Sequence, residues 1–291
     1  MIQSLEMHSG FVAWLFAVSF GASALGGMLG MAGGIFIVPI LALFGHLSIR
    51  TAIGASIVSV IACSCGSAAP LLRARLTNIR LAIVLETATT LGALSGVLVS
   101  NVIPVSYLFF LFGVVLWLSA QQMAARRGNP AVTSPAPAGR WAAALRLDSS
   151  YPDRVQGNDL PYRVQRLPLG MLLMYGAGFI SALLGIGSGV LKIPAMDTAL
   201  RLPIKVSSAT SNFMIGVTAA ASAGAYFMRG DIVPAVAGPV ALGSVAGAVV
   251  GARILMRLSN EGLRILFIVV LVVLGAQMFL QALGVQSLRP L

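Results

Sequence analysis

The chain has 291 residues, of which 58% are hydrophobic and only 9% are charged, and its mean hydropathy is +0.94. Soluble domains carry about 25% charged residues, so this composition excludes a soluble globular protein and indicates several membrane spans. A net charge of +11 would suggest nucleic acid as a partner of a soluble protein. Here the arginines cluster between apolar segments, as orientation by positive cytoplasmic loops requires, so we expect a lipid bilayer and no nucleic acid as partner.

The first half, residues 1–123, begins with MIQSLEMHSG, which lacks the basic segment of a cleaved signal. The expected elements that follow are a span at Phe11–Leu29, a glycine break at Gly30–Gly34, a short apolar piece at Ile35–Phe44, and spans at Thr51–Leu72, Leu81–Ser100 and Tyr107–Met123. A helix needs about 20 apolar residues to cross a bilayer. The short piece is therefore expected to be a half-helix or a re-entrant segment.

Residues 124–167 form the expected linker between the halves. They contain NPAVTSPAPAG and carry seven arginines against three aspartates. This composition is typical of a polar surface segment, and its positive charge predicts that it lies in the cytoplasm.

The second half, residues 168–291, repeats the series of the first. Its expected elements are Leu169–Leu184, a break at Gly185–Gly189, a short piece at Val190–Leu200, and spans at Val206–Met228, Ile232–Leu255 and Leu263–Leu283. At an offset of 155 residues the halves match without gaps, pairing Gly30 with Gly185, Gly34 with Gly189, Pro39 with Pro194, Ser56 with Ser211, Gly92 with Gly247, and Gln122 with Gln277. A register kept for about 100 residues predicts an internal repeat, the common architecture of secondary transporters.

The sequence thus predicts an all-α polytopic membrane protein with about eight long transmembrane helices and two short broken or re-entrant segments, in two tandem repeats. The direction of the second repeat depends on its opening pair of segments. If the pair crosses once, Arg253, Arg257 and Arg264 face outside, against the positive-inside rule. If it crosses twice they face inside, so charge favours inverted repeats.

The glycine breaks are the first candidate site. The motif is G-x-x-G-G in the first half and G-x-G-S-G in the second. A break followed by a new helix exposes backbone N–H groups and the positive end of a helix dipole, which together favour an anion. Close packing of helices through small residues is the alternative. The candidate substrate-binding residues at the breaks are Gly33, Gly34, Gly187, Ser188 and Gly189.

Two charges distinguish the second short segment from the first. Lys192 stands at the position of Ile37, and Asp197 at that of Ala42. Lys192 is either an anion contact or part of a proton-coupled site, or else a lysine whose ammonium snorkels to the membrane interface near a helix end. Asp197 and the basic residues after it read mainly as interfacial.

Glu86 is the other acid inside an expected span, and Ala241 is its counterpart in the second half. It lies one turn into its span, beside Arg80, which favours an interfacial ion pair over a proton relay.

Polar side chains begin the span after each short segment. We expect Ser56 in the first half, and Thr210, Ser211 and Asn212 in the second, to coordinate an oxyanion opposite the break. Hydrogen bonds to local backbone are the alternative.

We find no enzyme constellation: His8 and His46 share no metal-ligand spacing, and no nucleophile motif or nucleotide-binding motif occurs. The sequence therefore predicts neither an enzyme, nor a metal site, nor a cofactor.

The stretch SALLGIGSGVLKIPAMD, its first-half copy GGMLGMAGGIFIVPIL, and YPDRVQGNDLPYRVQRLPLG before it resemble the sulfite exporter TauE/SafE family of bacterial membrane permeases. The resemblance covers nearly the whole chain. It implies a multi-pass protein of the bacterial inner membrane that transports sulfite, thiosulfate or small organosulfonates, often outward and driven by a gradient. Ser188 and Ala32 depart from the family by standing where glycine is usual.

We therefore expect a secondary transporter whose partner is a small-molecule anion. Lys192 and the polar residues named above are expected to bind this anion at the glycine breaks. Access to the site is expected to alternate as the two repeats move. A carboxylate or metal-cation cargo, or a non-transporting membrane scaffold or sensor, are the alternatives. A homo-oligomer is compatible with the sequence.

Overall fold

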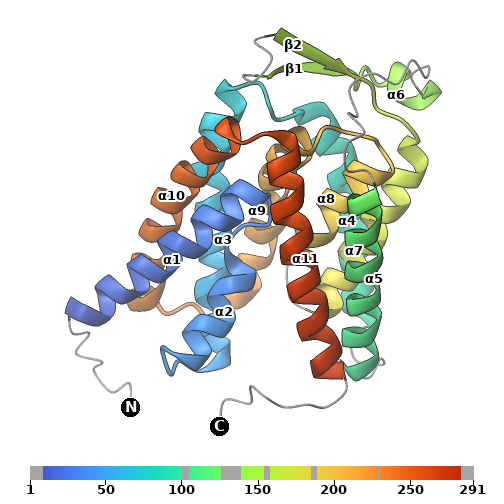
Figure 1. Ribbon diagram of the computed structural model, residues 1–291. Coiled ribbons are helices and arrows are strands. Elements are labelled where there is room, and N and C mark those ends of the chain that lie inside the picture. The colour runs from blue at the N-terminus through green and yellow to red at the C-terminus, as the bar shows by residue number, and fades with distance from the viewer. Residues whose placement is uncertain are drawn as a thin grey trace.

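The computed structural model describes residues 9–99, 105–125, 139–153, 158–184, 189–228 and 230–282. Within this part of the chain, eight helices of 18 to 25 residues and two of 10 residues form a bundle (Figure 1). The first half contains α1 (Ser9–Leu29), α2 (Gly34–Leu43), α3 (Ile49–Arg73), α4 (Ile79–Val99) and α5 (Val105–Ala125). The second half contains α7 (Leu167–Leu184), α8 (Gly189–Thr198), α9 (Ile204–Met228), α10 (Pro234–Arg257) and α11 (Asn260–Ala282).

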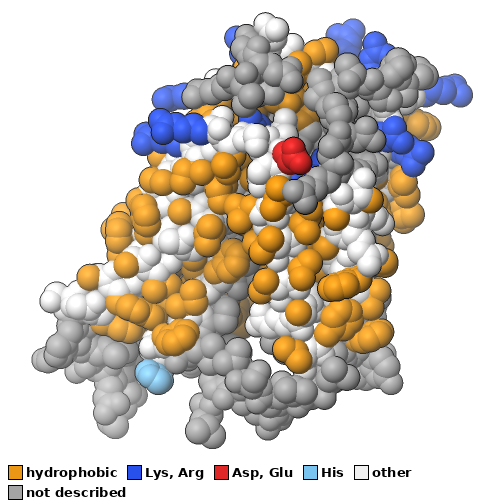
Figure 2. Space-filling model, viewed as in Figure 1, with side chains coloured by type: hydrophobic (Ala, Val, Ile, Leu, Met, Phe, Trp, Pro, Cys, Tyr) orange, Lys and Arg blue, Asp and Glu red, His pale blue; other side chains and the backbone are white. Residues whose placement is uncertain are grey.

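The long helices form where the apolar runs predict them, and their ends lie within three residues of the expected ones. By length and hydropathy, five helices in the described part are able to cross a membrane: α1, α3, α4, α10 and α11. Hydrophobic side chains cover the flank of the bundle in Figure 2, whereas Lys and Arg gather at one end. This distribution fits a multi-pass membrane protein, whose apolar belt faces lipid and whose charges stay at the interfaces.

The helices of the two halves begin 155 residues apart. This offset separates α2 from α8, α3 from α9, α4 from α10 and α5 from α11, and both members of the α2/α8 and α3/α9 pairs have the same length. The corresponding helices α3 and α9 nevertheless run in opposite directions. The start of α3, at Gly54, contacts the backbone of Asp231 just after α9, whereas Asn78, just after α3, donates its N–H to Thr210 near the start of α9.

Both short helices turn back toward the end at which their preceding helix began. The N–H of Gln165, before α7, donates to the carbonyl of Leu200, after α8, at 3.2 Å. Gly45, after α2, lies against the ring of Trp14 in the second turn of α1. Each short helix therefore folds back along the helix before it, a geometry that fits a re-entrant pair.

Helices of one half pack on helices of the other, through glycines that let the backbones touch. A Cβ at Gly247 of α10 would lie 2.1 Å from the carbonyl oxygen of Phe20 in α1. At the corresponding place a Cβ at Gly92 of α4 would lie 2.0 Å from the carbonyl oxygen of Tyr175 in α7. Small residues give such close approach in membranes, where van der Waals packing drives helix association. The halves thus exchange their opening helices.

The linker contains more structure than a polar surface segment predicts. It holds a short helix, α6 (Arg140–Ala144), and an antiparallel hairpin of β1 (Ser149–Asp153) and β2 (Asn158–Tyr162), which Figure 1 shows at one end of the bundle. Tyr151 and Tyr162 are buried, and the amide of Asn78 donates to the Tyr162 hydroxyl at 3.1 Å. The Tyr151 hydroxyl accepts from Asn260, so the α10–α11 loop lies at this same end.

Candidate functional site

The first glycine break is a tight reversal buried in the bundle. The backbone is left-handed at Gly30, with φ +79°, and at Ala32, with φ +44°. The chain then folds back on α1, where a Cβ at Gly26 would lie 2.2 Å from the nitrogen of Gly33. Gly33 and Gly34 are both buried at the N-terminus of α2. The break between two helices that the glycines predict is therefore present, and it lies away from solvent.

Side chains of α9 satisfy the carbonyl groups at the end of α1. The Ser211 hydroxyl donates to the Gly30 carbonyl at 2.7 Å, and the Asn212 amide donates to the Gly27 carbonyl at 2.6 Å. The last carbonyls of a helix have no partner within it, and leaving them unpaired in a membrane interior is costly. Ser211 and Asn212, which belong to the second half, therefore stabilise the end of α1 at the break of the first half.

The other predicted polar residues also bond to backbone. The Ser56 hydroxyl donates to the Gly34 carbonyl at 3.2 Å, and the Thr210 hydroxyl accepts from the backbone N–H of Asn78. All four polar residues are buried. None of these bonds is to local backbone, because the Thr210, Ser211 and Asn212 bonds reach the opposite half and the Ser56 bond reaches α2. Coordination of an oxyanion by these residues stays a prediction.

The first residue of α8, Gly189, meets the first break. A Cβ at Gly189, the first residue of α8, would lie 2.9 Å from Cα of Met31 and 3.2 Å from the carbonyl oxygen of Gly30. The start of α8 therefore touches the first break directly. Gly187 and Ser188 lie outside the described residues.

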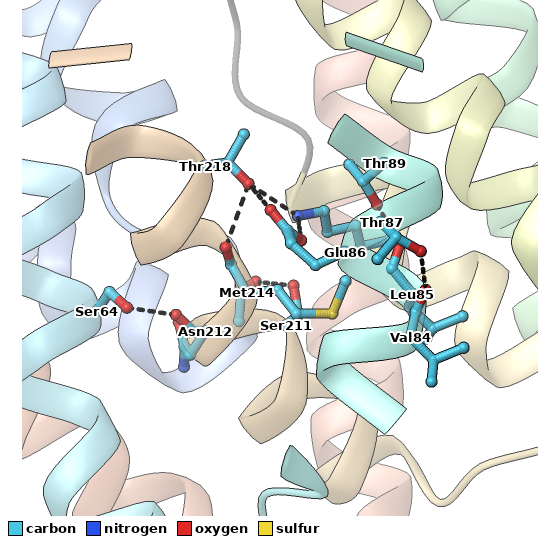
Figure 3. Close-up of polar contacts among 12 residues, drawn as sticks. Ser64, Val84, Leu85, Glu86, Thr87, Thr89, Ser211, Asn212, Met214 and Thr218 are labelled. Atoms are coloured by element: carbon cyan, nitrogen blue, oxygen red, sulfur yellow. Dashed lines mark hydrogen bonds and ion pairs between the residues drawn. The ribbon is translucent and has the colours of Figure 1, made fainter. Parts of the chain in front are cut away.

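Lys192 is completely buried one turn into α8 and forms an ion pair with Glu86 of α4. Its Nζ lies 3.0 Å from Glu86 Oε2 and donates at 3.4 Å to the hydroxyl of Thr218 in α9. Thr218 in turn donates to the other carboxylate oxygen, Oε1. Figure 3 shows the Glu86 and Thr218 side chains facing each other across α4 and α9. Two charges and a hydroxyl from three helices thus form one closed cluster.

This cluster corrects two expectations. Lys192 does not snorkel, because none of its surface reaches the interface. Glu86 does not pair with Arg80, whose guanidinium instead donates to the carbonyl of Arg146 in the linker. The neighbouring apolar side chains leave each charge dependent on the other, because an unpaired charge inside a membrane protein is expensive.

Asp197 forms a second buried ion pair, 2.8 Å from Nη2 of Arg264 in α11. Its side chain has no exposed surface. The pair links the end of α8 to the start of α11 and stabilises the linker end of the bundle.

A cavity of about 500 Å³ lies between α4 and α9 and reaches the ion pair. Its lining includes Glu86, Thr87 and Thr90 from α4, and Phe213 and Val217 from α9. The Glu86 side chain retains 12% of its surface, against none for Lys192. The carboxyl group therefore separates the cavity from the ammonium group.

Comparison with known proteins shows the family to which this chain is similar. The profile of the sulfite exporter TauE/SafE family matches residues 15–278. The chain belongs to the sulfite exporter TauE/SafE family. The TauE/SafE match confirms the resemblance carried by the two glycine motifs, and it includes both breaks and the Glu86–Lys192 pair.

A curated relative supports the same class. The probable membrane transporter protein YunE of Bacillus subtilis (strain 168) is 24% identical over 270 residues, which cover 90% of this chain and 95% of the relative. No solved structure matches the chain. As a TauE/SafE member with several helices able to span a bilayer, the chain is a multi-pass protein of a membrane transporter family.

Sequence reasoning missed Thr218 and underrated Glu86 in this TauE/SafE chain. One signal was available: Thr218 lies seven residues after Ser211, which puts both on one face of a helix. Nothing comparable pointed from Glu86 to Lys192, because their pairing depends on how α4, α8 and α9 pack together.

Proposed function

We propose that this protein is a secondary transporter for a small anion, with sulfite, thiosulfate or an organosulfonate as cargo. The observation that carries this assignment is the contact between the start of α8 and the first break, with Lys192 buried one turn further on. Helix N-termini present N–H groups and partial positive charge, and the Lys192 ammonium, which pairs with Glu86, lies nearby. This combination favours an anion over a cation.

The backbone N–H groups that follow Gly33-Gly34 and Gly187–Gly189 are the proposed contacts to the anion, and Lys192 supplies charge. Ser211 and Asn212 have a different part in the proposed site, because the Ser211 hydroxyl and the Asn212 amide each donate to a carbonyl of the α1 end. They keep those carbonyls, which would repel an anion, directed away from it. Ser56 has the same part at the Gly34 carbonyl.

Alternating access is proposed to arise from rocking of two inverted repeats, residues 1–123 and 168–291, each with four long spans. The shared offset of 155 residues and the opposite directions of corresponding helices support this relation. Transporters built from inverted repeats bind substrate where the repeats meet. The contact between the breaks lies at that boundary.

The linker at 124–167 is proposed to lie in the cytoplasm, with the protein in the bacterial inner membrane. The end of the bundle that carries the linker is rich in Lys and Arg (Figure 2). A cavity of about 300 Å³ opens there, lined by Arg73, Arg75 and Lys205 together with Asp159. This basic lining would attract anions to the cytoplasmic side.

A binding screen tests the assignment. Purified protein is melted with sulfite, thiosulfate, sulfoacetate, taurine, sulfate or carboxylates, and we expect sulfur oxyanions to raise the melting temperature. Lys192→Ala should abolish this shift, whereas Arg140→Ala, which removes an exposed charge in the linker, should keep it. Stabilisation by cations alone would contradict an anion site, and stabilisation by carboxylates alone would change the cargo. A protein that no solute stabilises would favour a membrane scaffold or sensor.

A further inference from the structure

The Glu86–Lys192–Thr218 cluster has an apolar counterpart in the other half. At the offset of 155 residues these positions correspond to Ala241, Ile37 and Cys63. Ile37 and Cys63 are fully buried, each within a hydrophobic cluster. The fold is therefore able to fill this position without charge.

A buried ion pair adds little stability compared with well-packed apolar side chains, because desolvation of the two charges offsets their attraction. Ionisable groups inside membrane proteins mark pathways for ions or protons. The one-sided replacement of Ala, Ile and Cys by Glu, Lys and Thr therefore points to transport rather than to folding.

We propose that Glu86 is the proton site of the transporter, and that its protonation releases Lys192 to bind a singly charged anion. This inference rests on the proposed function. Among the described residues, Lys192 is the only charged group in contact with Glu86. The Glu86 carboxyl group lines the cavity between α4 and α9 and retains 12% of its surface, whereas the Lys192 ammonium behind it is completely buried.

Other titratable groups near these helices are already engaged. On α7, the helix packed against α4, the Tyr175 hydroxyl shares a hydrogen bond with Ser95 at 2.7 Å. On α8, Asp197 pairs with Arg264. Arg80, at the start of α4, donates to the linker. The proton balance of the cluster is therefore set by Glu86 and Lys192.

Charge balance fixes the stoichiometry. With Glu86 ionised, carboxylate and ammonium cancel and the empty site is neutral. One proton from water on the carboxylate leaves the ammonium uncompensated, and one monovalent anion restores neutrality. A site holding only the proton, or only the anion, carries a net charge inside the membrane and is disfavoured. Proton and anion thus move together, one to one, and net direction follows their combined gradients.

Anion affinity as a function of pH tests this coupling. Methanesulfonate is the probe, since its sulfonate group stays ionised while sulfite itself gains and loses a proton near neutrality. For the unmodified protein, we expect affinity to be at least about tenfold higher at acid pH than at alkaline pH, because the proposed protonation of Glu86 frees the ammonium group. Glu86→Gln, which mimics the protonated acid, should keep the acid-side affinity at both pH values. Glu261→Gln, the same change at an exposed position, should behave as the unmodified protein.

A double variant keeps the test decisive if Glu86→Gln does not fold. Glu86→Ala with Lys192→Ile recreates two of the three residues of the other half, Ala241 and Ile37, so it should fold and bind no methanesulfonate at any pH. Retained pH-dependent binding by this variant would overturn the inference. So would pH-independent binding by the unmodified protein, although the anion-transport function would survive that result. No anion binding by the unmodified protein at any pH would overturn both.

Discussion

Replacing Gly178 with alanine should push α7 away from α4. A Cβ at this position would lie 2.1 Å from the carbonyl oxygen of Thr89, so the helices must separate by about 1 Å to restore an ordinary contact. Overpacking of this kind costs about 1–3 kcal/mol. Alanine regains up to about 1 kcal/mol through its higher helix propensity. We expect a net loss of about 1–2 kcal/mol in the free energy of unfolding.

Gly176 provides the matched control, because it lies two residues away on the same helix and a Cβ there meets nothing within 4 Å. Gly176→Ala should leave stability unchanged or raise it by up to about 1 kcal/mol. Unfolding of both variants by SDS titration in mixed micelles measures the difference. Equal stability of the two variants would refute the glycine contact between α4 and α7, and with it the exchange of opening helices between the halves.

Two further changes test buried polar contacts. Asp197→Asn leaves the Arg264 guanidinium without its counter-charge and should lower stability by about 3–5 kcal/mol; an unchanged melting temperature in detergent would contradict the ion pair. Ser211→Ala removes a hydroxyl that pairs a carbonyl at the end of α1, and should lower stability by about 1–3 kcal/mol. Ser207→Ala, four residues earlier, is the control, since that buried hydroxyl has no hydrogen-bond partner in the described part of the chain. Equal melting temperatures for the two serine variants would show that the hydrogen bond from Ser211 to the Gly30 carbonyl contributes nothing to stability.

Hydropathy and glycine spacing predicted the helices because both act locally. An apolar run of about 20 residues has few alternatives to a membrane helix. A cluster of glycines within such a run predicts that the helix ends there and that the chain turns. The offset of 155 residues likewise predicted that α2 and α8 would be equivalent, and their observed bounds are 155 residues apart.

The pairing of Glu86 with Lys192 could not be predicted in the same way. It joins residues 106 positions apart, on helices that meet only because the halves exchange partners. Local reasoning assigned Glu86 to its nearest cation in the sequence, Arg80, although side chains six positions apart do not face each other on a helix. The hydrogen bond from Ser211 to Gly30 also crosses between the halves, so the sequence indicated a polar residue at the right depth without indicating its partner.

The linker illustrates the opposite case. Its composition is polar and rich in proline, yet two tyrosines in it are buried against the end of the bundle. Two tyrosines change the average composition of the linker too little to predict a folded hairpin. The hairpin is evident only from the contacts of their hydroxyl groups with Asn78 and Asn260.

Flux of ³⁵S-labelled sulfite across proteoliposomes tests anion transport most directly. Vesicles with the purified protein should accumulate label faster than protein-free vesicles, and unlabelled methanesulfonate should compete. Lys192→Ala should reduce the rate to that of protein-free vesicles, while Arg140→Ala should transport normally. Sulfite flux no faster than through protein-free vesicles, or full flux in Lys192→Ala, would contradict an anion site built on Lys192 and the two glycine breaks.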